Sequence, residues 1–392
     1  MIPQSRLRPG VSVALSLGLF VATFLLTRQT QIPALSGLAA PWALLVTITY
    51  LRASPALGMI APIAAYVSLS LLTSLALGVD SGNALRFYVI TLGTLLAFYI
   101  KPRRISAPLA LLPLVLQAIV VAGISLWISQ DDELAIAARI LAREANLGDI
   151  YTVNGIYYRV QLIGNALLPL LFLVSLWKYR EGRFYRWATW LSLLGVIAAG
   201  NLTYMLVVGL AAFIRLGAKL RKSVGAWLLV GAVLIASVVA GWSDIEEVVE
   251  RKFEGSDSSM GVRFDQVDVL ATAWGDSPAT FLVGAGLGAP YPDGKERNYS
   301  EYQYIEVQAL YMTYQLGVVG ILLYLGSLAA LVHRFLDPAG RTIFWLYLLS
   351  GCTNPTVLDT NQIVTAMLLV CLFPRRTQAE PMHALRPVTS AA

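Results

Sequence analysis

Long apolar runs separated by short charged segments dominate this chain. A helix needs about 20 mostly apolar residues to cross the hydrocarbon core of a bilayer. Runs of this kind occupy residues 11–27, 34–51, 55–78, 84–100, 107–128, 160–177, 187–200, 202–217, 223–241, 308–332, 341–352 and 358–373. The seventh and eighth are weak because only Gly200 and Asn201 join them, and the eleventh is weak because its roughly 12 apolar residues are few for a full span. The pattern predicts an all-α polytopic membrane protein with about 12 transmembrane helices, in a single integral membrane domain over residues 1–392.

The charges between the runs test this topology independently, because Lys and Arg remain on the cytoplasmic side of a membrane. With the N-terminus inside, most of the 29 Lys and Arg residues fall in inside segments. All acidic residues except Glu181, Asp337 and Glu380 fall outside. This separation favours twelve spans with both termini cytoplasmic, and it makes residues 374–392 a flexible cytoplasmic tail.

Composition excludes several classes of protein. The chain is 57% apolar and only 13% charged, whereas soluble domains average roughly 45–50% apolar and about 25% charged residues. A soluble enzyme is therefore excluded, and so is a disordered chain, which needs low hydrophobicity and high charge. The net charge of +6 belongs to the inside segments, so we expect no nucleic-acid partner.

Two outer segments are long enough to build a site, the first loop at 129–159 and the larger loop at 242–306. Apolar residues recur at helical spacing between Asp131 and Asp149, which predicts an amphipathic helix along the membrane surface. In the second loop, helices are expected from Ser243 and across 262–274. The glycine-rich stretch 284–288 is expected to be a turn, because it lacks the spacing and the context of a dinucleotide fingerprint.

The end of the second loop predicts one more helix. Ser300 and Gln303 have the spacing of a capping box, which would start a helix at Glu301. If that helix runs unbroken to Leu331, it is longer than the hydrocarbon core is thick. Its first turns, including Glu306, would then lie at the outer interface.

Ionisable residues near the ends of spans are the best functional candidates, because charge at membrane depth is costly and usually faces a cavity or a partner. Arg159, Arg263 and Glu306 are the three that stand out on the outer side. Each has an ordinary alternative. Arg159 can extend to lipid headgroups, Arg263 can pair with Asp265, and Glu306 can be an interfacial charge without a function.

Three stretches in order resemble the O-antigen polymerase and ligase superfamily, the Wzy-type polymerases in particular. They are YYRVQLIGNALLPLLFLV at 157–174, VRFDQVDVLATAWGDSPATFLVGAGLG at 262–288 and EVQALYMTYQLGVVGILLYL at 306–325. The resemblance covers about 157–335, and the first five runs add only topology. It implies a GT-C type glycosyltransferase architecture in the bacterial inner membrane, with the active site facing the periplasm.

The resemblance implies a polymerase that joins oligosaccharide repeat units carried on undecaprenyl pyrophosphate. Arginine suits phosphate oxygens, because its planar fork makes bidentate, charge-assisted hydrogen bonds. Arg159 and Arg263 are therefore expected to bind the pyrophosphate, and Glu306 to act as general base in an inverting transfer without metal or cofactor. Further substrate contacts are expected from Tyr158, Gln161, Asn165, Tyr302 and Gln308. The outer tyrosines can equally anchor the protein at the interface.

Expected partners are the lipid-linked glycans, membrane lipids and a chain-length regulator protein. Ligases of the superfamily typically carry a histidine at the position of Glu306, and both histidines here, His333 and His383, fall inside. This favours a polymerase over a ligase. The alternatives are the ligase itself and a transporter such as a lipid-glycan flippase. A transporter is disfavoured by the absence of a clear internal repeat and by the gathering of ionisable residues at the outer edge.

Overall fold

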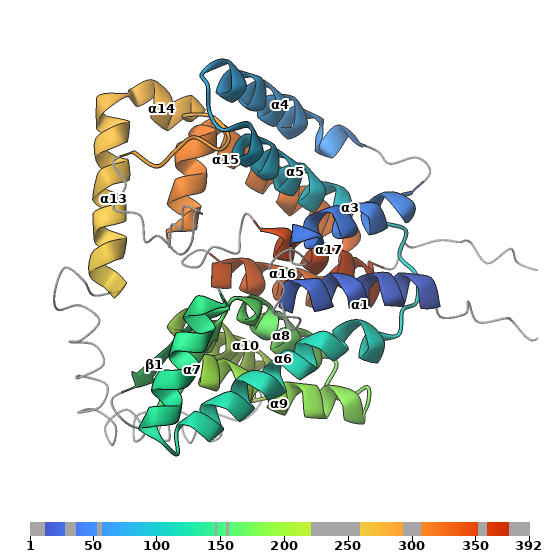
Figure 1. The fold of residues 1–392 in the computed structure, drawn as a ribbon. Coiled ribbons are helices and arrows are strands. Elements are labelled where there is room, and N and C mark those ends of the chain that lie inside the picture. Colours follow the sequence, from blue (N-terminus) through green and yellow to red (C-terminus); the bar gives the residue numbers. More distant parts are fainter. Residues whose placement is uncertain are drawn as a thin grey trace, which may run out of the picture.

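The structure is a computed structural model that describes residues 12–27, 37–52, 57–145, 147–153, 157–220, 259–292, 307–351 and 359–375. It is mostly helical (Figure 1). The helices are α1 (Val13–Thr27), α3 (Ala39–Thr49), α4 (Ala61–Ala76), α5 (Ser81–Ala97), α6 (Ala107–Ile128), α7 (Asp132–Glu144), α8 (Leu168–Trp177), α9 (Arg183–Ala199), α10 (Leu202–Leu220), α13 (Ser259–Asp276), α14 (Pro278–Val283), α15 (Gln308–Phe335), α16 (Pro338–Gly351) and α17 (Thr360–Leu372). Two strands, β1 (Gly148–Val153) and β2 (Tyr157–Leu162), form an antiparallel hairpin. Short 3₁₀ turns cover Leu57–Met59 and Ile163–Leu167.

Each apolar run that the structure describes contains an α-helix, although the sixth run is helical only in part. Helix α6 covers the predicted run 107–128, and the other described runs each contain one helix. The run at 223–241, the helix expected from Ser243 and the tail from residue 376 lie outside the described residues. Local signals set several helix ends. The Asp80 carboxylate caps α5 by accepting from the Asn83 N–H at 2.7 Å, and Gly200 ends α9 in the left-handed conformation.

Two described helices, α6 and α15, are long and apolar enough to cross a membrane. Several shorter helices are similarly apolar: Val13–Thr27, Ala39–Thr49, Ala61–Ala76, Ile163–Trp177, Leu202–Arg215 and Thr360–Leu372. Large apolar side chains also cover the outside of the bundle, as in Leu72, Leu126 and Leu206, each more than 60% exposed. Soluble monomers rarely expose such continuous apolar surface. These features are those of a helical membrane protein.

Charged residues separate to the two ends of the helices. The C-terminal ends of α3 and α15 meet where the Arg52 guanidinium lies 4.5 Å from the Phe335 ring, and those of α8 and α17 meet where the Lys178 ammonium lies 5.0 Å from the Phe373 ring. We call this region the basic end. Its described cations are Arg52, Lys101, Arg103, Arg104, Lys178, Arg180, Arg183, Arg186, Arg215, Arg334, Arg341 and Arg375.

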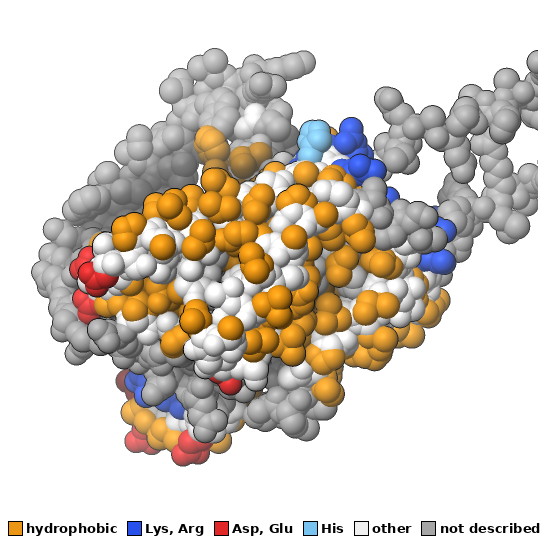
Figure 2. Space-filling model, turned by 90° about the horizontal axis from the view of Figure 1, so that it is seen from above, with side chains coloured by type: hydrophobic (Ala, Val, Ile, Leu, Met, Phe, Trp, Pro, Cys, Tyr) orange, Lys and Arg blue, Asp and Glu red, His pale blue; other side chains and the backbone are white. Residues whose placement is uncertain are grey.

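The opposite ends of the helices form what we call the acidic end. It includes the N-termini of α5 and α17, which Asp80 and Asp359 cap, and the hairpin with α7. Figure 2 shows apolar side chains over the face between the ends, with Asp and Glu towards the left and lower left and most Lys and Arg towards the right. In Figure 1, the hairpin, α7 and α13 all lie on the left.

Two predicted elements are wrong in detail. The sixth run, 160–177, was expected to be one span, but Tyr157–Leu162 is a strand and α8 begins only at Leu168. A helix running unbroken from Glu301 to Leu331 is also excluded. Val307 has a non-helical conformation, and α15 breaks at Gly317, where φ is 65° and ψ is 171°. The remaining loop helices agree, since α7 and α13 lie where amphipathic helices were expected.

Candidate functional site

The hairpin has one apolar face and one polar face, because side chains alternate along a strand. Ile150 and Val160 lie opposite each other in the register and are buried in a cluster with Val121 of α6 and Ala142 of α7. The other face carries Asp149, Tyr151, Tyr157, Arg159 and Gln161. The apolar face therefore fixes the hairpin to α6 and α7, and Arg159 and Gln161 lie on the opposite face of the hairpin.

Polar contacts with α6 and α7 position the second strand. The Tyr158 carbonyl accepts from Ser125 Oγ at 2.7 Å, and its hydroxyl donates to Asp132 Oδ1 at 2.7 Å. This hydrogen bond to the carboxylate raises the pKa of Tyr158 above its ordinary value. The sequence predicts that Tyr158 contacts substrate. In the structure, its side chain links the hairpin to the start of α7 through the hydrogen bond to Asp132.

Asn165, another expected substrate residue, is buried beneath the hairpin. Its Oδ1 accepts from Gln117 Nε2 at 3.0 Å, and its Nδ2 donates to the Val160 carbonyl at 2.8 Å. Its side chain therefore joins the strand end to α6 and is only 3% exposed. The structure places Asn165 as part of the scaffold that holds the strand of Arg159.

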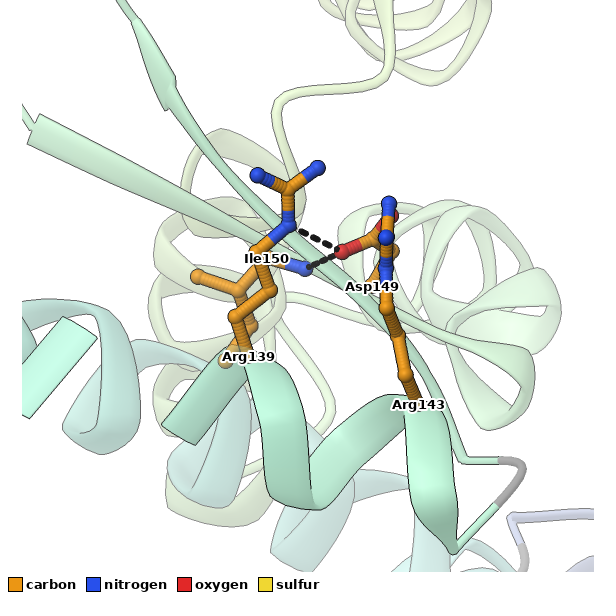
Figure 3. Close-up of polar contacts among 4 residues, drawn as sticks. All are labelled: Arg139, Arg143, Asp149 and Ile150. Atoms are coloured by element: carbon orange, nitrogen blue, oxygen red, sulfur yellow. Dashed lines mark hydrogen bonds and ion pairs between the residues drawn. The ribbon is translucent and has the colours of Figure 1, made fainter. Parts of the chain in front are cut away.

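Two arginines of α7 converge on one carboxylate of the hairpin (Figure 3). Arg139 Nε lies 3.0 Å from Asp149 Oδ1, and Arg143 binds Asp149 Oδ2 through Nε at 2.9 Å and through its terminal nitrogen. The Ile150 N–H also donates to Oδ1 at 2.8 Å. The Asp149 side chain is 4% exposed, whereas those of Arg139 and Arg143 are 42% and 54% exposed.

The pKa of Asp149 lies below its ordinary value. Burial, the largest single influence, acts to raise it, but hydrogen bonds from Arg143, Tyr151, Arg139 and the Ile150 N–H together outweigh burial. Asp149 is therefore charged near neutral pH, and it holds both guanidinium groups beside the hairpin.

Arg159 completes a group that we call the arginine cluster, Arg139, Arg143 and Arg159. The guanidinium carbons of Arg139 and Arg159 lie 5.2 Å and 4.6 Å from the centroid of the Tyr151 ring. A β-carbon at Gly200 would come within 2.6 Å of Arg159 Cβ, so α9 ends with a glycine where the arginine stem passes. With Asp149, the cluster carries three positive charges against one negative.

Sequence reasoning found Arg159 but missed Arg139, Arg143, Asp149 and Tyr151. Arg139 and Arg143 are four residues apart, which places them on one face of a helix. That spacing was a usable signal. Their convergence on Asp149 was not foreseeable without the strand pairing.

Arg263 and Gln308 belong to a second group at the acidic end, built by α13, α14 and α15. The Gln266 carbonyl, one turn after Arg263, accepts from the Tyr291 hydroxyl at 2.7 Å, and Gln266 Oε1 lies 3.4 Å from the Val307 nitrogen. Gln308 is 7% exposed at the start of α15. The helix of Arg263 therefore packs against the residue that follows Glu306. Glu306 and Tyr302 themselves lie outside the described residues.

The glycine-rich stretch 284–288 packs against α15 where that helix breaks and donates hydrogen bonds to its free carbonyls. The Tyr314 carbonyl accepts from the Ala285 N–H at 2.8 Å, and the Gln315 carbonyl accepts from the Gly286 N–H at 3.1 Å. The Tyr66 hydroxyl lies 2.7 Å from the Leu316 carbonyl and can donate to it. The stretch is a turn, as expected, and it supplies the hydrogen bonds that the broken helix loses.

Within the described ranges, no group of three or more His, Cys, Asp or Glu residues is arranged so that it could hold a metal ion. Comparison with protein-family models, with curated proteins and with solved structures gives no match. The described features that bear on function are therefore the arginine cluster, the second group around α13 and the apolar bundle that carries them.

Proposed function

We propose that this chain is a Wzy-type membrane polymerase. It would join oligosaccharide repeat units carried on undecaprenyl pyrophosphate at the outer face of a bacterial inner membrane. The arginine cluster is the observation that carries the proposal. Three guanidinium groups lie together at the acidic end of an apolar bundle, where the other cations among the described residues are Arg86 and Arg263. A ligand that is polyanionic and lipid-linked fits both the charge and the apolar surface beside it.

The proposed topology has twelve spans, with both termini and the basic end in the cytoplasm. The gathering of Lys and Arg at one end of the helices supports this orientation, because the cytoplasmic side of a membrane protein is enriched in them. The exposed apolar residues Ile136, Ile140 and Leu141 of α7 would enter the outer leaflet, since an amphipathic interfacial helix buries its apolar face there. The hairpin then lies at the level of the headgroups.

In the proposed reaction, an acceptor sugar hydroxyl attacks the anomeric carbon of the donor sugar. The bond from that carbon to the pyrophosphate oxygen breaks, and the lipid pyrophosphate leaves with the bonding electron pair. Arg159 and Arg263 would bind the leaving pyrophosphate, and Glu306 would take the proton of the acceptor hydroxyl. Inversion at the anomeric carbon follows from a single displacement, with no metal or cofactor.

The surroundings of Arg159 support its role in binding phosphate. Its stem passes Gly200 and its guanidinium lies over Tyr151, so the side chain is held before a ligand arrives. A preordered side chain loses less conformational entropy on binding. Arg139 and Arg143, which Asp149 holds nearby, add positive charge without having to touch the substrate.

The rival functions fit less well. Broken helices in transporters usually expose backbone groups to the substrate, whereas the carbonyls at the break in α15 are bonded to the glycine-rich turn and lie near the Tyr66 hydroxyl. This observation favours a structural break over a transport site. A ligase would share the donor and differ only in its acceptor, so it remains the alternative within the same fold.

The test is polymerisation of synthetic lipid-linked repeats by the purified protein. We expect Arg159→Lys to fold normally and to lower the rate by about 10–1,000-fold, because lysine keeps the charge but loses the bidentate geometry. Arg86→Gln, an exposed arginine at the same end, is the matched control and should polymerise normally. Full activity of Arg159→Lys would contradict the assignment, and absence of polymer from the unaltered protein would contradict the function.

Two further measurements separate the parts of the mechanism. Glu306→Gln should abolish long products while leaving binding of the lipid-linked donor intact, because the amide cannot accept the hydroxyl proton. Normal chain lengths in that variant would rule out Glu306 as the base.

A chelator should leave polymerisation unchanged, and strong inhibition would refute a metal-independent reaction.

A further inference from the structure

A cavity of about 410 Å³ opens at the basic end, far from the arginine cluster along the helices. It lies where α8 and α17 end, beside α10 and the turn between α15 and α16. Its lining includes Trp177, Lys178, Glu181, Arg215, Asp337 and Phe373. Two cations, two carboxylates and two aromatic rings therefore surround one space, whose volume is within the range of small-molecule sites.

Lys178 is already satisfied by its neighbours. Its ammonium lies 3.0 Å and 2.8 Å from the two carboxylate oxygens of Glu181, and 5.0 Å from the centroid of the Phe373 ring. The charge of Lys178 is therefore balanced by Glu181 and by the Phe373 ring, and the charge of Glu181 is balanced by Lys178. The charges left to meet a ligand are those of Arg215 and Asp337.

Arg215 has donors to spare. Within the part of the chain that the structure describes, its one hydrogen bond goes to the Trp177 carbonyl at 3.4 Å, and its guanidinium lies 5.9 Å from the Trp177 ring. A guanidinium has five N–H donors in a planar fork that matches the oxygens of a phosphate. The half-buried Arg215 side chain therefore fits a ligand phosphate on its side of the cavity.

Asp337 has an acceptor to spare. Its Oδ1 accepts from the Gly340 N–H at 2.7 Å and so caps α16, while no residue that the structure describes donates to Oδ2. A carboxylate oxygen at this place fits a hydrogen-bond donor with positive charge. The cavity thus offers a cation to one part of a ligand and an anion to another.

The cavity also borders the apolar surface of the bundle. Phe213 and Ile214, which directly precede Arg215 on α10, are exposed. Acyl chains can lie along these residues while a headgroup enters the cavity, since pockets with charged side chains at the ends of membrane helices bind lipid headgroups. A lipid therefore fits better than a free solute.

We infer that this cavity binds the headgroup of an ethanolamine phospholipid, with the phosphate on Arg215 and the primary ammonium on Asp337. The balanced charge of the lining favours this zwitterion over an anionic lipid. The cavity lies at the opposite end of the molecule from the proposed polymerase site. Lipid binding there requires that the bundle spans a membrane, as proposed above, but not that the chain is a polymerase.

The test uses the purified full chain in detergent and follows its melting temperature as dihexanoyl-phosphatidylethanolamine is added. We expect a saturable rise in melting temperature. Dihexanoyl-phosphatidylcholine should give a much smaller rise, because its quaternary ammonium cannot donate a hydrogen bond. Inorganic phosphate and O-phosphoethanolamine should give little or none. An equal rise with the choline lipid, or with inorganic phosphate, would overturn the inference.

Variants locate the site. Arg215→Gln should weaken the apparent affinity for the ethanolamine lipid by about tenfold or more, the effect of losing one charge-assisted bond. Asp337→Asn keeps an oxygen to cap α16, so it should fold while losing the preference for ethanolamine over choline. Arg186→Gln, an exposed cation at the same end, is the matched control. Unchanged affinity in Arg215→Gln would overturn the assignment.

Discussion

Asp149 is the residue on which the arrangement of the arginine cluster depends. It is buried, and it binds both guanidinium groups of α7 and the Ile150 N–H. Its pKa is lowered in the folded protein, so it binds protons less readily there than in the unfolded chain. Its contribution to stability is therefore present above the pKa of the unfolded state and is lost as the pH falls through the folded pKa.

We expect Asp149→Asn to destabilise the hairpin by about 1.5–3 kcal/mol, towards the lower figure because Arg139 and Arg143 are half exposed. Hydrogen exchange of the β1 amides at neutral pH measures this locally. Asp268→Asn, at an exposed position on α13, is the control and should change stability by less than about 0.5 kcal/mol. On acidification below about pH 4, the unaltered hairpin should lose protection, whereas the Asp149→Asn hairpin should change little. Equal acid sensitivity in both would contradict the linkage.

Among the elements, the hairpin is the one that helical periodicity does not predict. Tyr158, Val160 and Leu162 alternate with more polar positions, and Asn154-Gly155 is a dipeptide typical of hairpin turns. The apolar run that begins at Val160 also fits the start of a span, because a short apolar run does not distinguish strand from helix. Pairing with β1 decided between them.

The break in α15 gives a prediction at the same scale. Gly317 lies in a region of φ and ψ that only glycine adopts readily, and a β-carbon there would lie 2.4 Å from the Gly284 nitrogen. We expect Gly317→Ala to lower the free energy of unfolding by about 1–3 kcal/mol and to lower the melting temperature. Gly326→Ala, in the same helix with nothing near its added carbon, should be neutral or stabilising by up to about 1 kcal/mol. Similar behaviour of the two variants would show that the break is not required.

At the scale of the whole molecule, an apolar belt separates the two charged ends. The proposed orientation is checked by labelling single cysteines in a cysteine-free background with a maleimide that does not cross membranes. In intact cells with a permeable outer membrane, we expect Glu133→Cys and Asp268→Cys at the acidic end to react. Arg180→Cys and Arg186→Cys at the basic end should react only after the inner membrane is opened. The reverse pattern would invert the topology, and labelling of both ends in intact cells would contradict a spanning bundle.

The sequence by itself determined the helical, strongly apolar character of the chain, the positions of most described helices and the separation of charge between loops. These properties follow from hydrophobicity and charge, which act residue by residue. Only the tertiary structure decided that Tyr157–Leu162 is a strand, that α15 breaks at Gly317, and that Arg139 and Arg143 join Arg159. Each of these depends on a partner distant in the chain or in another element: β1, the glycine-rich turn or Asp149. A contact of that kind has no periodicity in the sequence that would reveal it.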